Sequence, residues 1–282
     1  TNLLLGVVPF LFYSFLLGFL NGIEHEMRHN IVFPKSMDWF NNAVFFLIHV
    51  LYKDGSRYQR ASHRIHHQYT MVRGVDPETD YPETLTEQYL RRFLLKMVFG
   101  VLTLGIPSLL SAFGILIQRM AGKTNPLVLA RCSEKDKRII RLESWVIFLI
   151  NIAASALFII FRQWFLIALL MLAPRIGLII VGFWFHTEHL SMMHNSSDQR
   201  LCTRGVKVSL FVRFLYGGLD EHVEHHLFPA VPSRNLSALR MALDWNIPAR
   251  QNVIQCWREI FSIARHLEKN PDDVFVPEGM SV

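Results

Sequence analysis

Long runs without charged side chains constrain this chain more than any other feature. Residues 1–23, 97–118 and 144–161 contain no Asp, Glu, Lys or Arg, and residues 163–187 contain only Arg175. Each run approaches the roughly 20 apolar residues that an α-helix needs to cross a bilayer. Because 51% of the chain is hydrophobic and these residues come in runs rather than stripes, the sequence predicts an all-α integral membrane protein.

The runs also predict a topology. The first run lacks a basic segment and a cleavage site of small residues, so we expect a retained span rather than a signal peptide. The last two runs predict a hairpin that turns at Arg162 and Gln163. The expected spans are residues 2–22, 144–161 and 163–185.

Residues 97–118 carry Gly105 and Pro107 near their middle. Pro interrupts helical hydrogen bonding, so we expect a re-entrant or interfacial element here rather than a straight span. The next segment, residues 119–141, is rich in Lys and Arg and is therefore predicted to lie on the cytoplasmic side. We expect one domain over residues 1–282, capped on that side by a helical region at residues 190–282.

Arg175 lies near the middle of a predicted span. A charge at that depth needs a partner or water. We expect it to pair with a polar group such as Asn151 in the neighbouring helix; the alternative is a role beside a substrate or water path. The three cysteines are few and widely spaced, which fits a reducing compartment.

Most of the histidines lie in three short motifs, here called boxes. The boxes HEMRH, HRIHH and HVEHH hold eight of the 13 histidines: His25, His29, His63, His66, His67, His222, His225 and His226. Spacings of three and four residues place imidazoles on one face of a helix. Neutral imidazole binds first-row metals without adding charge. The sequence therefore predicts that the chain brings the three boxes together around metal.

One alternative is a zinc peptidase. HEMRH matches the H-E-x-x-H pattern, in which His25 and His29 would bind zinc and Glu26 would act as general base. Such a site needs three protein ligands, so it leaves two histidine boxes unused. A membrane protein that only holds metal, without catalysis, is a further alternative.

The three boxes, in this order and spacing, resemble the membrane fatty acid desaturase and hydroxylase superfamily. The resemblance extends to the Asp-Pro-Glu segment at residues 76–78 and to Gly-Gly-Leu at residues 217–219. The chain lacks the His-Pro-Gly-Gly motif of a fused cytochrome b5, so it resembles the stand-alone acyl desaturases. The resemblance implies a non-haem site with two iron ions, held by the eight box histidines and by His189.

The resemblance leaves open the roles of residues beside the boxes. Phe185 stands where some relatives carry an asparagine that helps to hold the metal through water, and His186 could replace it or be the ligand instead of His189. Candidates for metal contact or for hydrogen bonds to ligands are His186, Glu188, Glu26, Asp220 and Glu224. We expect His49 to be a buried structural histidine and His266 to lie on the surface. His194 matches no box spacing, so we do not expect it to be a ligand.

We expect the protein to be an O2-dependent acyl desaturase that binds two iron ions. A hydroxylase or an acetylenase would use the same site, because substrate position decides the outcome. The implied partners are membrane lipids, an acyl substrate carried on a lipid, on coenzyme A or on a carrier protein, and an electron donor of the ferredoxin or cytochrome b5 type. The net charge of +6 fits the basic cytoplasmic segment, and no nucleic-acid module is present in the sequence.

Overall fold

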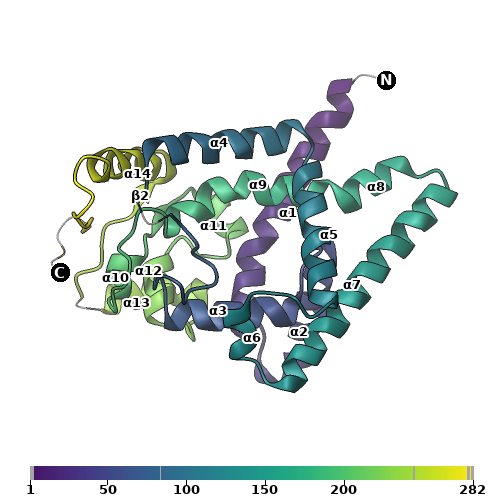
Figure 1. Cartoon of the computed structure of the whole chain (residues 1–282), viewed down its shortest axis with the longest axis horizontal. Helices are drawn as coiled ribbons and strands as arrows, with labels where there is room; N and C mark the ends of the chain where they lie inside the picture. Colours follow the sequence, from purple (N-terminus) through teal and green to yellow (C-terminus); the bar gives the residue numbers. More distant parts are fainter. Residues whose placement is uncertain (1–2, 83, 244, 278–279, 281–282) are drawn as a thin grey trace. The chain divides into compact units, whose positions relative to one another are not determined.

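The computed structural model describes residues 3–82, 84–243, 245–277 and 280, and its regular structure is nearly all helical, as predicted (Figure 1). The chain divides into two compact units. Unit one comprises Thr1–Ser62 and Met97–Val181, and unit two comprises His63–Lys96 and Gly182–Val282. The boundaries fall inside α3 (Ser56–Gln68), α4 (Glu87–Leu102) and α9 (Ala173–Phe185).

Three helical stretches of the described residues are long and apolar enough to cross a membrane: Gly6–Arg28, Glu134–Ile160 and Trp164–Glu188. They correspond to the three predicted spans. The first lies in α1 (Leu3–Arg28), the second is α7 (Glu134–Ile160), and the third joins α8 (Trp164–Met171) to α9. The predicted hairpin turn is confirmed, since α7 ends at Ile160 and Arg162 has a positive φ of 56°.

Helix α7 begins ten residues before the predicted span because a polar cap starts it in the basic segment. The hydroxyl of Ser133 accepts a hydrogen bond from the amide of Asp136 at 3.1 Å. Glu134 and Asp136 also place negative charge in the first turn, where the helix dipole favours it. The apolar run marks the membrane segment, and the cap marks the start of the helix.

The expected break in the run 97–118 is confirmed. Helix α4 and helix α5 (Ile106–Met120) are bent by 97° relative to one another. Leu104 and Gly105 have positive φ values of 53° and 72° at the bend. Pro107 occupies the first turn of α5, where the missing amide hydrogen costs nothing. The bent element begins at Glu87, earlier than predicted.

Unit one also contains η1 (Lys35–Met37), α2 (Asp38–Tyr52) and α6 (Pro126–Ala130). Helices α1 and α9 approach closely at Gly18 and Gly177, where a Cβ on Gly177 would lie 2.1 Å from the carbonyl oxygen of Ser14. Helices α2, α5 and α7 pack through Val50, Leu116 and Ile147.

The expectation that Arg175 pairs with polar groups is confirmed, but Asn151 is not the partner. Arg175 donates to the hydroxyl of Ser108 at 2.8 and 3.0 Å and to the carbonyl oxygen of Tyr52 at 2.9 Å. Tyr52 ends α2, so its carbonyl lacks an intrahelical partner. Asn151 instead donates to the carbonyl oxygens of Val50 and Ile147. Arg175 therefore has a structural role in joining elements of unit one.

Unit two packs around an apolar core that includes Leu90, Leu190, Trp257 and Ile260. Its described residues are helical or irregular apart from one short parallel pair of strands, in which Val206 is in register with Gln251. The region is mostly helical, as predicted, and the strand pair was not foreseen because two-residue strands are too short to show an alternating pattern. Its remaining elements are η2 (His186–Glu188), α10 (Gln199–Cys202), β1 (Val206–Lys207), α11 (Leu210–Leu215), α12 (His222–Leu227), η3 (Ser233–Asn235), α13 (Leu236–Ala242), β2 (Gln251–Asn252) and α14 (Val253–Leu267).

Candidate metal centre

Two of the three histidine boxes lie in unit two, each on a helix. The second box occupies the C-terminal turns of α3, and the third box forms most of the six-residue helix α12. His63, His66, His222, His225 and His226 are each at most 4% exposed. So many buried imidazoles on two helices agree with the predicted one-face spacing and exclude a solvated surface patch.

The first histidine group consists of His63, His67 and His225. One ring nitrogen of each lies within 4.8 Å of the others. The Nε2 atom of His67 is 3.0 Å from Nε2 of His63 and 3.1 Å from Nε2 of His225. Two helices thus turn three Nε2 atoms toward one point.

The second histidine group consists of His66, His189, His222 and His226. Ring nitrogens of His66, His189 and His226 lie within 4.8 Å of one another. The Nε2 atom of His222 is 3.0 Å from Nε2 of His189 and 3.1 Å from Nε2 of His226. The two groups are adjacent, since the rings of His67 and His226 stack with centroids 4.3 Å apart.

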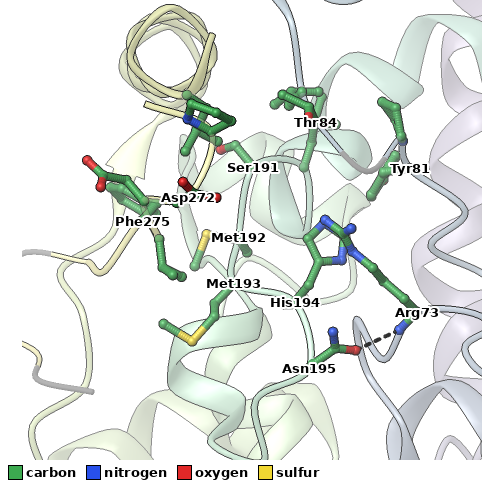
Figure 2. Close-up of a pocket in the computed structure, with 17 residues that line it drawn as sticks. Arg73, Tyr81, Thr84, Ser191, Met192, Met193, His194, Asn195, Asp272 and Phe275 are labelled. Carbon is green, nitrogen blue, oxygen red and sulfur yellow. Dashed lines mark hydrogen bonds between the residues drawn. The ribbon is translucent and has the colours of Figure 1, made fainter. Parts of the chain in front are cut away.

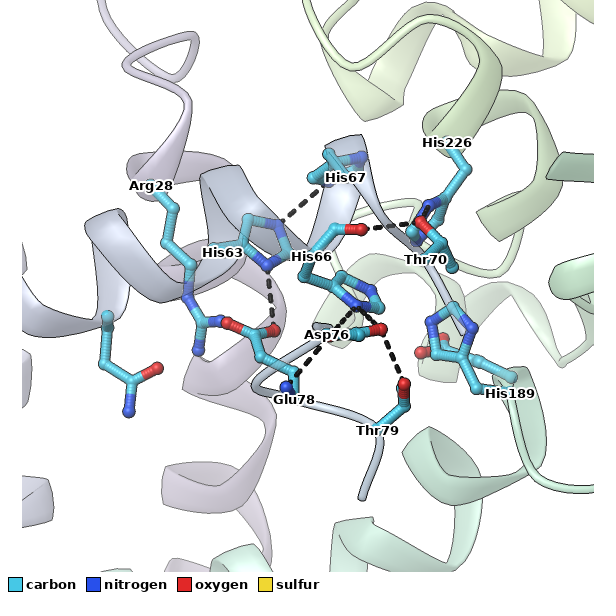
Figure 3. A network of polar contacts seen from close by, with 12 residues as sticks. Arg28, His63, His66, His67, Thr70, Asp76, Glu78, Thr79, His189 and His226 are labelled. Atoms are coloured by element: carbon cyan, nitrogen blue, oxygen red, sulfur yellow. Dashed lines mark hydrogen bonds and ion pairs between the residues drawn. The ribbon is translucent and has the colours of Figure 1, made fainter. Parts of the chain in front are cut away.

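The Nδ1 atoms, on the other side of these rings from Nε2, contact acceptor groups of the surrounding chain (Figure 3). Nδ1 of His66 lies 2.9 Å from the carboxylate of Asp76, and Nδ1 of His63 lies 3.0 Å from that of Glu78. Nδ1 of His189 donates to the carbonyl oxygen of Cys202 at 3.1 Å. Such contacts fix the ring and leave Nε2 available to a metal. Sequence reasoning noted Asp76 and Glu78 only as part of a family motif and missed this role.

Burial favours the neutral form of two of these imidazoles. It lowers the pKa of His189 to about 3, helped by the nearby His66, and it lowers the pKa of His226 well below its ordinary value, helped by its neighbouring histidines. Burial would raise the pKa of Asp76, but hydrogen bonds from His66, Thr79 and the amide of Glu78 hold it at about 2. Neutral rings backed by an anionic carboxylate suit a divalent metal.

The first box lies in unit one. His25 belongs to the last turn of α1 and His29 follows its end, with ring centroids 5.6 Å apart. Glu26 lies between them in the same helix. The role of these three residues stays a prediction.

The remaining histidines stand largely as expected. His49 is buried and its Nε2 lies 3.0 Å from the carboxylate of Glu24, and the exposed His266 pairs with Asp273. His186 packs its ring edge-on against Phe93 at 4.8 Å and belongs to neither histidine group of the described residues.

Two of the candidate carboxylates are paired with arginine. Asp220 accepts from Arg213 at 3.1 Å and from Arg250 at 2.7 Å, and Glu224 forms an ion pair with Arg240. These arginines balance the charge of acidic residues beside and within the third box. Whether Asp220 and Glu224 also contact metal stays a prediction.

Comparison with known proteins now decides the family. Residues 2–257 match the family described as fatty acid desaturase. The chain belongs to this family. A 66-residue segment is 38% identical to the acyl-lipid (9-3)-desaturase of Physcomitrium patens and covers 21% of this chain and 13% of that protein. A 48-residue segment is 44% identical to the Delta(6)-fatty-acid desaturase fat-3 of Caenorhabditis elegans, covering 17% of this chain and 11% of that protein. No solved structure matches the chain.

Membership of the fatty acid desaturase family implies iron, and the donor set fits that metal. Imidazole nitrogens suit iron as well as zinc and copper, so the ligands alone do not select it. Two adjacent groups, each with at least three ring nitrogens, provide more donors than one zinc site requires. The match over residues 2–257 also argues against a peptidase built on HEMRH alone.

A cavity of about 240 Å³ lies in unit two beside the segment that follows His189 (Figure 2). Residues 190–195 form one wall, and Arg73, Tyr81, Asp272 and Phe275 contribute to the others. The side-chain oxygen of Asn195 accepts a hydrogen bond from the amide of Arg73 at 3.0 Å. His194 lines this cavity and lies outside both histidine groups, as its spacing predicted.

Proposed function

We propose that this protein is an O2-dependent fatty acyl desaturase with two iron ions. The observation that supports it most is the pair of adjacent histidine groups, whose Nε2 atoms converge at 3.0–3.1 Å. In unit two, the proposed ligands are His63, His67 and His225 for one ion and His66, His189, His222 and His226 for the other. His25 and His29 of the first box are proposed as further ligands, because their spacing repeats the pattern of the other boxes.

Bound iron would supply the activation of O2 that an unreactive methylene group requires. The overall reaction removes two hydrogens from a –CH2–CH2– segment. With O2, two electrons and two protons it yields –CH=CH– and two molecules of water. The electrons would come from a separate donor of the ferredoxin or cytochrome b5 type. The same ligands could serve a hydroxylase or an acetylenase, since the position of the acyl carbon decides the outcome.

The protein's own residues would prepare the site for this chemistry. Asp76, Glu78 and the Cys202 carbonyl hold the Nδ1 atoms of three histidines, so these rings keep one orientation. Their burial excludes water, which protects a strong oxidant from side reactions. Ligands whose rings are held in one orientation agree with a catalytic rather than a storage role.

The proposed substrate is an acyl chain carried on a lipid, on coenzyme A or on a carrier protein. The names of the relatives are those of acyl-lipid and fatty acid desaturases. The proposed placement is an integral membrane protein with the histidine boxes on the cytoplasmic side. The basic residues of segment 119–141 support this orientation.

Metal analysis and product analysis test the proposal together. Detergent-purified protein from iron-replete cells should contain about two irons per chain. Cells that express the protein should accumulate a fatty acid with one more double bond, detected by mass spectrometry of methyl esters, and a variant with His225→Ala should not. Zinc that persists when iron is supplied, with no O2 consumed on any acyl substrate, would overturn the proposal. A hydroxylated or acetylenic product would identify the alternative reaction.

A further inference from the structure

Glu188 differs from the other acidic residues around the histidine groups. It ends η2, directly before His189, and is 4% exposed. Its Oε1 atom accepts a hydrogen bond from the hydroxyl of Tyr216, a fully buried side chain. The hydrogen bond from the phenol holds Oε1 in place, and this also determines the direction in which Oε2 points.

The other oxygen faces the second histidine group. Oε2 of Glu188 lies 3.5 Å from Nε2 of His222, the same nitrogen that approaches His189 and His226 at 3.0 and 3.1 Å. A separation of 3.5 Å is long for a hydrogen bond. It matches two ligands of one ion, because donor atoms about 2.1 Å from a metal are about 3–3.5 Å apart.

The charge of the Glu188 carboxylate also favours a nearby metal ion. Asp220, Glu221 and Glu224 are also buried, and each forms an ion pair with an arginine. Within the described part of the chain, the carboxylate of Glu188 contacts Tyr216 and His222 and forms no ion pair with Lys or Arg, while its backbone carbonyl accepts from the amide of Arg204. An ionised carboxylate buried among neutral groups is costly unless a cation compensates it. A metal ion at the second histidine group would supply that cation.

We infer that Glu188 is a carboxylate ligand of the metal ion at the second histidine group, through Oε2, and that Tyr216 is its positioning residue. The inference rests on the proposed di-iron function and deepens it. The ligand set becomes four imidazoles and one carboxylate for one ion, against imidazoles alone for the other. The two irons are therefore chemically inequivalent.

Mössbauer spectra of protein loaded with iron-57 test this. The unaltered protein should show two distinct doublets of equal area. Glu188→Gln keeps the shape of the side chain and removes its charge, so one doublet should shift and about one iron should be lost faster to a chelator. Tyr216→Phe removes only the hydrogen bond, and the same doublet should shift by less. Glu87→Gln breaks the ion pair with the exposed Arg91 elsewhere in unit two and should change neither doublet.

The outcomes separate the inference from the proposed function. Two irons with both doublets unchanged in Glu188→Gln and in Tyr216→Phe would overturn the inference and leave the di-iron function intact. Protein that binds no iron at all would overturn both. If Glu188→Gln does not fold, as judged by its elution on size-exclusion chromatography, Tyr216→Phe alone decides: an unchanged spectrum overturns the inference and a shift of one doublet supports it.

Discussion

The carboxylate of Asp76 accepts a hydrogen bond from Nδ1 of His66, with Oδ2 2.9 Å from the ring nitrogen. The same carboxylate accepts from the amides of Met71 and Glu78, each at 2.9 Å, and from the hydroxyl of Thr79 at 2.5 Å. One buried side chain thus determines both the orientation of a histidine and the shape of the loop that follows its helix. This dual role explains why an acidic residue follows the second box closely.

Replacement of Asp76 should therefore weaken metal binding without removing a proposed ligand. In Asp76→Ala, His66 loses the acceptor that fixes its ring, so iron affinity should fall about 10–100-fold. Competition with a chromogenic chelator measures this. Asp80→Asn, at an exposed position of the same loop, is the matched control and should keep the original affinity. Equal affinities for the two variants would contradict the assigned role of Asp76.

The apolar runs and histidine spacings predicted much of this architecture, because each is a local property. A span shows as a run of uncharged residues, and Gly105 with Pro107 marked the bend. Helix starts were missed where a polar cap lies outside the run, as Ser133 does for α7. The partners of Arg175 were missed because hydrogen bonds between Arg175, Ser108 and Tyr52 join distant parts of the sequence.

In the candidate site, too, local patterns could be predicted from the sequence and long-range contacts could not. The boxes identified their histidines, and the structure gathers seven of the nine proposed ligands into the two groups of unit two. The hydrogen-bond partners lay beyond sequence reasoning. Thr70 is next to the second box in sequence, yet its hydroxyl oxygen is 3.2 Å from His226, 156 residues away. Tyr216 carries no local pattern that would link it to Glu188.

Loss of a histidine from the second group should remove iron selectively. His226 contacts His222 and stacks on His67, so His226→Ala should abolish desaturation and leave roughly one iron per chain. Metal analysis of the purified variant measures the stoichiometry. His266→Ala is the control, since His266 pairs with Asp273 at the surface and should retain both irons. Full iron content in His226→Ala would contradict its assignment as a ligand.

The contact between α1 and α9 should tolerate no side chain at Gly177. A Cβ there would meet the Ser14 carbonyl oxygen at 2.1 Å and the Gly18 amide nitrogen at 2.7 Å, and backbone atoms cannot rotate away. Gly177→Ala should therefore destabilise the protein by about 1–3 kcal/mol, as overpacking does elsewhere. Thermal unfolding in detergent provides the measurement.

Helix α5 offers the matched control for that change. A Cβ on Gly114 would meet no atom within 4 Å. Gly114→Ala should be neutral or stabilise the helix by up to about 1 kcal/mol, because alanine restricts the unfolded chain. Similar melting temperatures for the two alanine variants would show that α1 and α9 are not packed as closely as described.

Lys53 should make stability depend on pH. Its ammonium group is buried after α2 and donates to the carbonyl oxygens of Leu51 and Leu170. Burial, and then the nearby Arg175, lower its pKa from 10.5 to about 7. Between these two values the unfolded chain holds more protons at this site than the folded chain does. Stability should therefore rise with pH across this window, by at most about 3 kcal/mol between about pH 7 and about pH 9.5.

Substitution of the lysine separates this effect from the titration of other groups. Lys53→Met keeps the length of the apolar stem and removes the charge, so the rise of melting temperature with pH should become smaller than in the unaltered protein. Lys207→Met, at an exposed lysine of β1, should preserve the original slope. Melting temperatures measured in detergent across that range decide the point. A slope unchanged by Lys53→Met would mean that Lys53 stays protonated in the folded protein, with its charge compensated by the carbonyl groups around it.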